Sequence, residues 1–189
     1  MTWFSMKDPN TGYEVTLKQL KHTNTPDYLE CNQNPFEVYP NFKHIWKNPE
    51  FQQQAEQATM EYVESSKNPN FKDGSILVIF ISGNEFTEQT PIGICGWYVV
   101  NNANDYWIAH RWFGIIPSYQ KRGFARLALN CMECSVFNIV EALYVAVFTE
   151  HALNFWVKMG YTLVDPNSDE YQIVKSSDDS EPKYILKTL

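Results

Sequence analysis

The turn at residues 120–125, Gln-Lys-Arg-Gly-Phe-Ala, stands where a predicted strand gives way to a predicted helix. The free N–H groups and aligned peptide dipoles at a helix start attract anions. Residues 106–132 contain no Asp or Glu but hold four basic side chains: Arg111, Lys121, Arg122 and Arg126. In a chain of formal net charge −7, this basic stretch indicates a phosphate-bearing ligand. The alternative is an ordinary turn in which Gly123 serves only packing.

Hydrophobic patterning predicts the elements that must position this turn. Strands are expected at 13–20, 75–82, 92–100, 106–116, 142–148, 161–164 and 183–187, and helices at 49–65, 121–137 and 149–159, with only short helices within 22–48. Strand 142–148 follows a helical connection, so it runs parallel to strand 106–116. We expect one domain over residues 1–189, with a loose arm at 1–10 and an exposed hairpin insertion at 165–182.

Composition limits the class of protein. The 189 residues are 44% hydrophobic, which is enough for one globular domain with a sizeable core. No run reaches the ~18 apolar residues of a membrane span and the N-terminus lacks a secretory pattern, so we expect a soluble, cytoplasmic chain without a membrane partner. The excess of 22 acidic over 15 basic side chains argues against a nucleic-acid partner.

The four cysteines show no disulfide-framework spacing, which fits a reducing compartment. Cys131 and Cys134 form a C-x-x-C pair, but no second pair of ligands accompanies it, and we predict no metal site. One turn apart on an apolar helix, they are better interpreted as small buried hydrophobic residues than as a redox or zinc site.

The turn itself resembles a motif of the GNAT superfamily of N-acetyltransferases. Gln120-x-x-Gly123-x-Ala125, after a strand that ends in Ile-Ile-Pro, is similar to the family's Q/R-x-x-G-x-G/A acetyl-CoA motif. The predicted order of elements is the GNAT order from end to end. The resemblance therefore implies an α/β fold of the layered α+β type. It would have a mixed, mostly antiparallel sheet of six to seven strands, about four flanking helices, and a splay between strands 106–116 and 142–148.

A second segment, residues 152–161, resembles the family's A-x-x-x-Y-x-x-x-G-F segment, which covers the pantetheine arm of the cofactor. Ala152, Lys158, Gly160 and Tyr161 match it. Two positions depart from the family: Thr149 stands where it often has Asn, and Trp156 stands where it often has the Tyr that protonates the departing thiolate.

The chemistry of that family sets what the chain must supply. An amine attacks a thioester, so the site needs a neutral amine, a polarised carbonyl and a leaving thiolate. Alkyl amines have a pKa near ~10.4 and a Cys-like thiol near ~8.5, so the thiolate leaves without a strong acid. Trp156 can offer an indole N–H to the sulfur, but a core aromatic is the favoured interpretation. His110, ordinarily of pKa ~6.5, is the candidate base where the family's strand Glu is missing; the alternative is a structural histidine.

The resemblance also implies how acetyl-CoA, the co-substrate, would bind. A backbone N–H at Ile115 or Ile116 would pair with the acetyl oxygen and the pantetheine, and the N–H groups of 121–125 would hold the pyrophosphate. Lys121, Arg122 or Arg126 would reach the adenosine phosphates, or each is simply a solvated side chain. The predicted cofactor-binding residues are Ile115, Ile116, Gln120, Lys121, Arg122, Gly123, Phe124, Ala125, Arg126 and Asn154.

The acceptor pocket in this fold is shaped by the segment between the first strand and the second helix. Here that segment carries Tyr28, Tyr39 and Trp46, along with acidic residues, which would suit a cationic amine. The alternative is that these aromatics close the core.

We therefore expect an acyl-CoA-dependent N-acyltransferase that moves an acetyl group from acetyl-CoA to a primary amine of a small molecule or peptide by direct attack. It would be a monomer or homodimer. The first alternative is a catalytically silent acyl-CoA-binding or regulatory module with the same fold, which the missing Tyr and strand Glu favour. The second is a structural protein whose turn binds nothing.

Overall fold

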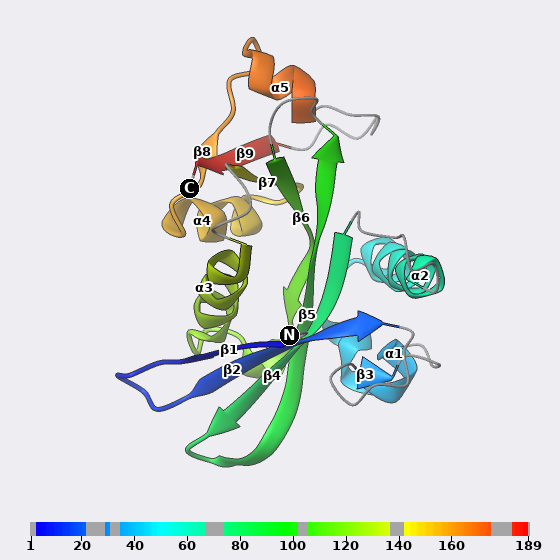
Figure 1. Ribbon diagram of the computed structural model, residues 1–189, viewed down its shortest axis with the longest axis vertical. Coiled ribbons are helices and arrows are strands. Elements are labelled where there is room, and N and C mark those ends of the chain that lie inside the picture. Colours follow the sequence, from blue (N-terminus) through cyan, green and yellow to red (C-terminus); the bar gives the residue numbers. More distant parts are fainter. Residues whose placement is uncertain are drawn as a thin grey trace. The chain divides into compact units, whose positions relative to one another are not determined.

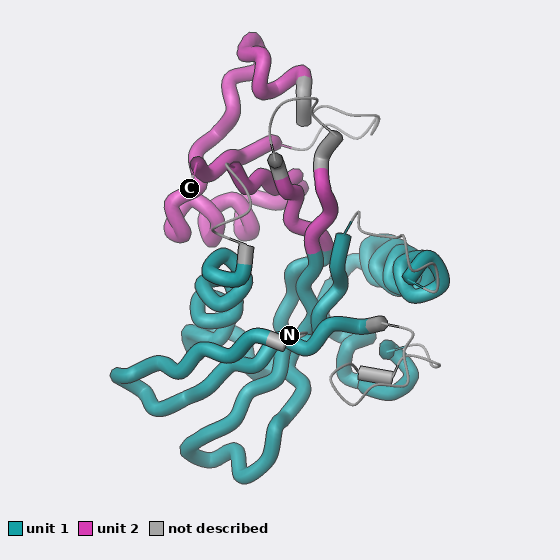
Figure 2. The backbone as a smooth tube through the Cα atoms, viewed as in Figure 1, with its two compact units in different colours: residues 1–96, 112–135 teal, residues 97–111, 136–189 magenta. Residues whose placement is uncertain are grey.

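A computed structural model describes residues 3–21, 29–30, 35–66, 74–101, 106–136, 142–174 and 183–188 (Figure 1). The chain divides into two compact units, one of residues 1–96 and 112–135 and the other of residues 97–111 and 136–189 (Figure 2). Strands β5 (Phe86–Asn101) and β6 (Tyr106–Ile115) contribute to both units. Among the described residues, no helix is long and apolar enough to cross a membrane.

The first unit is built mostly on antiparallel strands. Besides parts of β5 and β6, its strands are β1 (Trp3–Lys7), β2 (Glu14–Lys21), the short β3 (Leu29–Glu30) and β4 (Gly74–Gly83). β2 pairs antiparallel with β1 on one side and with β4 on the other, and β4 in turn lies beside β5. β4 is buried from Ser75 to Ile81, which explains its continuous apolar run, since a strand covered on both faces has no solvent-facing positions.

Helices cover both faces of these strands. The helices of the first unit are α1 (Pro35–Val38), the 3-10 turn η1 (Pro40–His44), α2 (Pro49–Ser65), the 3-10 turn η2 (Pro117–Tyr119) and α3 (Phe124–Val136). Alternate β4 residues, Ile76, Val78 and Phe80, share a buried cluster with Phe36 of α1 and Tyr62 of α2. Figure 1 shows α3 on the opposite side of β4 and β5 from α2.

Two glycines let the backbones of the first unit approach closely. A Cβ atom on Gly93 of β5 would lie less than 3.0 Å from the carbonyl oxygen of Gly114 on β6. A Cβ atom on Gly114 would lie equally close to the side chain of Ile45, which follows η1. Both positions therefore require glycine, and together they seat the connection between η1 and α2 directly against β6.

The second unit contains the end of β5, the start of β6 and the C-terminal elements. These are β7 (Ala142–Val147), α4 (Glu150–Lys158), β8 (Thr162–Leu163), α5 (Asp169–Val174) and β9 (Lys183–Thr188). β7 pairs parallel with β6 and antiparallel with β9, which also pairs with β8. Ala109, Ala142, Tyr144 and Tyr184 form a buried cluster in this unit.

The predicted fold class is confirmed, including the splay. The sheet is mixed and mostly antiparallel, with nine strands in the described part of the chain rather than six to seven. The β6–β7 ladder joins residues 107–109 to residues 142–144. Within the described residues the two strands then continue without pairing, β6 to Ile115 and β7 to Val147.

Two local predictions differ from the structure. Residues Trp3–Lys7 are not a loose arm but a strand, because their backbone extends the sheet beside β2. In the predicted hairpin insertion at 165–182, residues Asp169–Val174 form a helix instead, since the Ser168 hydroxyl accepts a hydrogen bond from the Tyr171 N–H (3.2 Å) and two acids follow in the first turn. The rest of that insertion, residues 175–182, lies outside the described residues. The single domain stays a prediction.

Candidate functional site

The segment between β6 and α3 forms a compact turn with an unusual backbone. After η2, Lys121 and Gly123 both adopt left-handed conformations, with φ of 62° and 86°. The Leu127 N–H then donates to the Gly123 carbonyl oxygen (3.1 Å), which begins the hydrogen bonding of α3. In turns of this kind, left-handed residues can aim neighbouring N–H groups toward one side, an arrangement that suits an anion. The start of α3 adds the positive end of a 13-residue helix.

The space beside Gly123 is open. A Cβ atom built on Gly123 would meet no atom within 4 Å, whereas one on Gly93 or Gly114 would overlap with its neighbours. Packing within the first unit therefore does not explain the glycine. Its positive φ is a reason for glycine, and the space beside its backbone is open.

Two predicted cofactor residues are engaged within the protein. The Gln120 side-chain N–H donates to the Ile115 carbonyl oxygen (2.8 Å), so Gln120 fastens the turn to the end of β6. The Ile116 N–H donates to the Ile92 carbonyl oxygen (2.8 Å) and is not available to an acetyl oxygen in this structure. Of the two backbone positions proposed for that role, Ile115 is the one that remains.

The cation of Arg122 is also engaged. Its guanidinium forms an ion pair with Glu85 of the β4–β5 hairpin and donates to the Tyr13 hydroxyl (3.1 Å). The same group lies 4.9 Å from the Phe124 ring centre and 5.5 Å from that of Phe86. Hydrogen bonding, from Tyr13 first and also from Arg122, lowers the pKa of Glu85. Arg122 therefore ties the turn to the hairpin, while Lys121 and Arg126 remain exposed.

In the second unit, α4 positions a buried aromatic group. The helix is capped by Thr149, which stands where the GNAT segment often has Asn. The Thr149 hydroxyl accepts a hydrogen bond from the Ala152 N–H (3.2 Å). Gly160, with φ of 92°, ends the helical turn in a left-handed conformation. Tyr161 follows and is buried, and its N–H donates to the Trp156 carbonyl oxygen (3.2 Å).

His110 on β6 lies within this buried group. Its Nε2 atom and the Tyr161 hydroxyl are 2.6 Å apart, and its ring centre lies 5.0 Å from that of Trp156. Its Nδ1 atom has no hydrogen-bond partner among the described residues. Burial, assisted by the positive charge of Lys187, lowers the pKa of His110 to about 3. A base works best with a pKa near the working pH, so the lowered pKa disfavours His110 as the general base, a role that stays a prediction.

The pKa of His110 makes a prediction for stability. The folded protein holds the imidazole neutral down to about pH 3, whereas the unfolded chain binds the proton near pH ~6.5. Stability from this residue is therefore complete above pH ~6.5 and is lost as the pH falls toward 3, by up to ~1.4 kcal/mol per pH unit. We expect the urea midpoint of the wild type to fall more steeply between pH 6.5 and 4 than that of His110→Gln, in which the side chain cannot titrate. Parallel profiles would contradict the buried, neutral imidazole.

Trp156 packs as a core aromatic. It is buried, and its ring centre lies 5.0 Å from that of Tyr161 and 5.3 Å from that of Phe155. This agrees with the favoured interpretation of Trp156 over a catalytic one. Asn154, on the same helix, is exposed, and its cofactor role stays a prediction.

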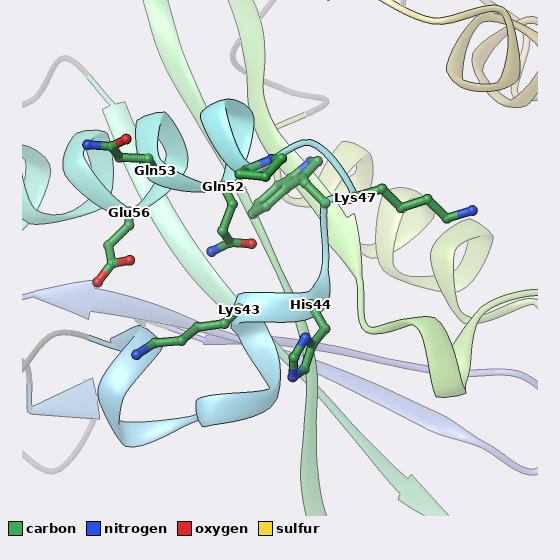
Figure 3. A pocket seen from close by; sticks show the side chains of 8 residues that line it. Lys43, His44, Lys47, Gln52, Gln53 and Glu56 are labelled. Carbon is green, nitrogen blue, oxygen red and sulfur yellow. The ribbon is translucent and has the colours of Figure 1, made fainter.

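The predicted acceptor residues do not share one site in the described structure. Tyr39 joins the core of the first unit, with its ring centre 5.2 Å from that of Phe42, and Tyr28 lies outside the described residues. Trp46 lines an open pocket of about 590 Å³ between η1 and the start of α2 (Figure 3). The other lining residues are Lys43, His44, Lys47, Pro49, Gln52, Gln53 and Glu56.

Solved structures share this architecture. An acetyltransferase from Streptococcus agalactiae 2603 matches with a TM-score of 0.61 at 14% identity, covering 95% of this chain and 99% of that one. FdhC, a nucleotide-linked sugar GNAT in its apo form, matches with a TM-score of 0.57 at 14% identity, covering 92% and 86%. The chain has the GNAT fold. Spermidine N-acetyltransferase from Vibrio cholerae, in complex with CoA and spermine, matches with a TM-score of 0.57 at 17% identity, covering 92% and 95%. No family model matches the sequence, and no curated protein does.

Several residues of this GNAT fold were missed from the sequence. Gly93 and Gly114 fix the spacing of β5, β6 and the η1–α2 connection, and Lys43 and Gln52 line the pocket. A glycine within an apolar strand signals a close backbone approach, so Gly93 and Gly114 carried a readable sign. Lys43 and Gln52 carried none, because their position depends on how η1 meets α2.

Proposed function

We propose that the chain is an acyl-CoA-dependent N-acyltransferase that moves an acetyl group from acetyl-CoA to a primary amine by direct attack. One observation carries the proposal: the open, left-handed turn at Lys121 and Gly123 at the start of α3. N–H groups at a turn of this kind and at a helix start suit the charged oxygens of a pyrophosphate. The GNAT fold and the CoA found in a structural neighbour support the same ligand.

The residues of the turn divide the work of binding. The N–H groups of residues 121–125 would hold the pyrophosphate, with Gly123 giving it room. Lys121 and Arg126 are the exposed cations that would meet the adenosine phosphates. Gln120 and Arg122 would act indirectly. Gln120 fastens the turn to β6 and Arg122 fastens it to the β4–β5 hairpin, which keeps the backbone of the turn in its binding conformation.

The reaction joins the amine nitrogen to the acetyl carbon and breaks the bond from that carbon to sulfur. The amine must lose one proton, and the sulfur leaves as a thiolate. A thiolate is stable enough to leave without an acid, since a thiol of this kind has a pKa near ~8.5. Trp156 therefore need not replace the family's Tyr. The buried His110, with its pKa lowered to about 3, is a weak acceptor for the amine proton at neutral pH.

A second candidate is a catalytically silent acyl-CoA-binding module. It is favoured by the same two residues, because His110 is buried and neutral and Trp156 packs in the core. Both candidates predict that acetyl-CoA binds at the turn, and they differ in turnover.

Free-thiol release from acetyl-CoA against a panel of amines separates the two. The panel should include polyamines, aminoglycosides, amino acids and short peptides, with thermal-shift binding of CoA recorded alongside. An acyltransferase releases thiol with one class of acceptor and yields the acetylated amine in equal amount. CoA binding without release across the whole panel would favour the silent module, and no CoA binding would overturn both.

A further inference from the structure

The pocket between η1 and α2 is connected to β6, the strand that leads to the turn. Trp46 forms part of its wall, and its ring centre lies 5.8 Å from that of Trp112 on β6. Because Gly114 has no side chain, Ile45 and Trp46 lie against the β6 backbone, one residue before Ile115. The pocket, Ile115 and the turn at 120–126 all belong to the first unit.

The charges around the pocket favour an anion. Lys43 and Lys47 stand in its lining against a single carboxylate, Glu56, although the chain as a whole has a formal net charge of −7. The imidazole ring of His44 also lines the pocket. A polyamine would meet two like charges here, whereas a carboxylate would meet opposite ones.

Gln52 is one of the lining residues of the pocket, and its amide lies buried at the edge of it. Neither the nitrogen nor the oxygen of its amide has a hydrogen-bond partner among the described residues, and both atoms are buried. Figure 3 shows the amide pointing from α2 toward η1, where Lys43 and His44 lie, while Lys47 extends outward from the rim. An unpartnered buried amide destabilises a fold, so its presence in the wall of a pocket points to a ligand.

We propose that this pocket binds the acceptor and that the acceptor is a primary amine which also carries a carboxylate. Lys43 holds the carboxylate and the Trp46 ring packs against the apolar part of the molecule. The Gln52 amide turns out of its buried position to hydrogen-bond to the polar part. The inference rests on the proposed acyl transfer only in calling the bound molecule the acceptor. The preference of the pocket for a carboxylate rests on its own side chains.

Binding of matched amines to the protein, with and without CoA, tests this. Calorimetry would compare phenylalanine with phenylalaninamide, a phenylalanine-containing dipeptide with its C-terminal amide, and spermidine alone. The dipeptide separates a peptide source of the carboxylate from a free amino acid. We expect each carboxylate to bind about tenfold or more tightly than its amide, as loss of one charge-assisted hydrogen bond predicts.

Variants of the lining residues test whether the preference for a carboxylate arises in this pocket. Lys43→Gln should remove the difference between carboxylate and amide, and Lys47→Gln should reduce it less because its side chain extends outward. The matched control is the double variant Lys7→Gln and Lys183→Gln, which changes the net charge by more at exposed sites and should keep the full difference. A carboxylate preference that survives Lys43→Gln would overturn the proposal.

The outcomes keep the two proposals apart. CoA binding together with amides or spermidine bound as tightly as the carboxylates would overturn the acceptor class and leave the acyl transfer standing. Carboxylate binding that depends on Lys43, in a protein that does not bind CoA, would support the ligand class of the pocket and overturn the acyl transfer. Binding of no amine at all would overturn the pocket proposal.

Gln52→Met gives a readout that a purely structural residue would not. Because the substitution removes two buried polar atoms without partners and keeps a similar shape, the melting temperature of the free protein should rise by about 2–4 °C. Affinity for the carboxylate amines should fall at the same time. A lower melting temperature would show that the amide is satisfied in the folded protein and would contradict its role in binding.

Discussion

Gly123→Asn is expected to weaken acetyl-CoA binding by about a hundredfold while leaving the fold intact. Asparagine tolerates a positive φ, so the backbone at 86° is kept with little strain. In the free protein the new Cβ atom meets nothing within 4 Å. Its side chain occupies the space beside the N–H groups, and the loss of two charge-assisted hydrogen bonds corresponds to about this factor. Calorimetric titration of acetyl-CoA measures it.

Gly123→Val separates obstruction from backbone strain. A β-branched residue resists positive φ, so this variant should lose thermal stability as well as affinity, whereas Gly123→Asn should lose affinity alone. Unchanged affinity in both variants would mean that nothing binds beside Gly123, and the turn would then be a structural one.

Gly93→Ala is expected to lower the free energy of unfolding by about 3 kcal/mol or more, the upper range for forcing extra atoms into a packed core. The new methyl group would lie less than 3.0 Å from the Gly114 carbonyl oxygen, and a backbone oxygen cannot rotate away as a side chain does. β5 and β6 must therefore separate. The hydrogen bond from the Ile116 N–H to Ile92 lies at the same place and should weaken too. Urea denaturation at pH 7 measures the change.

Gly160→Ala is the matched control for Gly93→Ala. Gly160 has a positive φ of 92°, but the nearest atom to an added Cβ would be the Lys187 side chain at 3.8 Å. Its cost is therefore backbone strain alone, about 1 kcal/mol. Equal losses of stability in the two variants would contradict the close approach of β5 and β6.

The sheet and the turn were predictable from the sequence because both are encoded locally. The apolar run of β4 and the aromatic and β-branched content of β6 mark buried strands over a few consecutive residues. The same holds for the turn, where a proline, a glycine and a helical pattern follow one another. α5 was missed although its signal was local: Ser168 is followed by two acids, which is a helix start.

The contacts between distant parts of the chain were not predictable. Arg122 pairs with Glu85, 37 residues earlier in the chain, so nothing near Arg122 shows that its charge is engaged. His110 has an ordinary pKa in the sequence, and only its burial beside Tyr161 and Trp156 lowers the value to about 3. Desolvation depends on the packing of two segments that meet in the fold.

Titration of acetyl-CoA into ¹⁵N-labelled protein, followed by amide NMR spectra, tests most directly whether the turn at residues 120–126 is the acyl-CoA site. The amide signals of Lys121, Arg122, Gly123 and Ala125 should shift together and saturate with the calorimetric affinity, as donors to a pyrophosphate do. The amide of Ile116, held by Ile92, should respond less. Spectra in which these amides stay unmoved at saturating acetyl-CoA would contradict the assignment of this turn as the cofactor site.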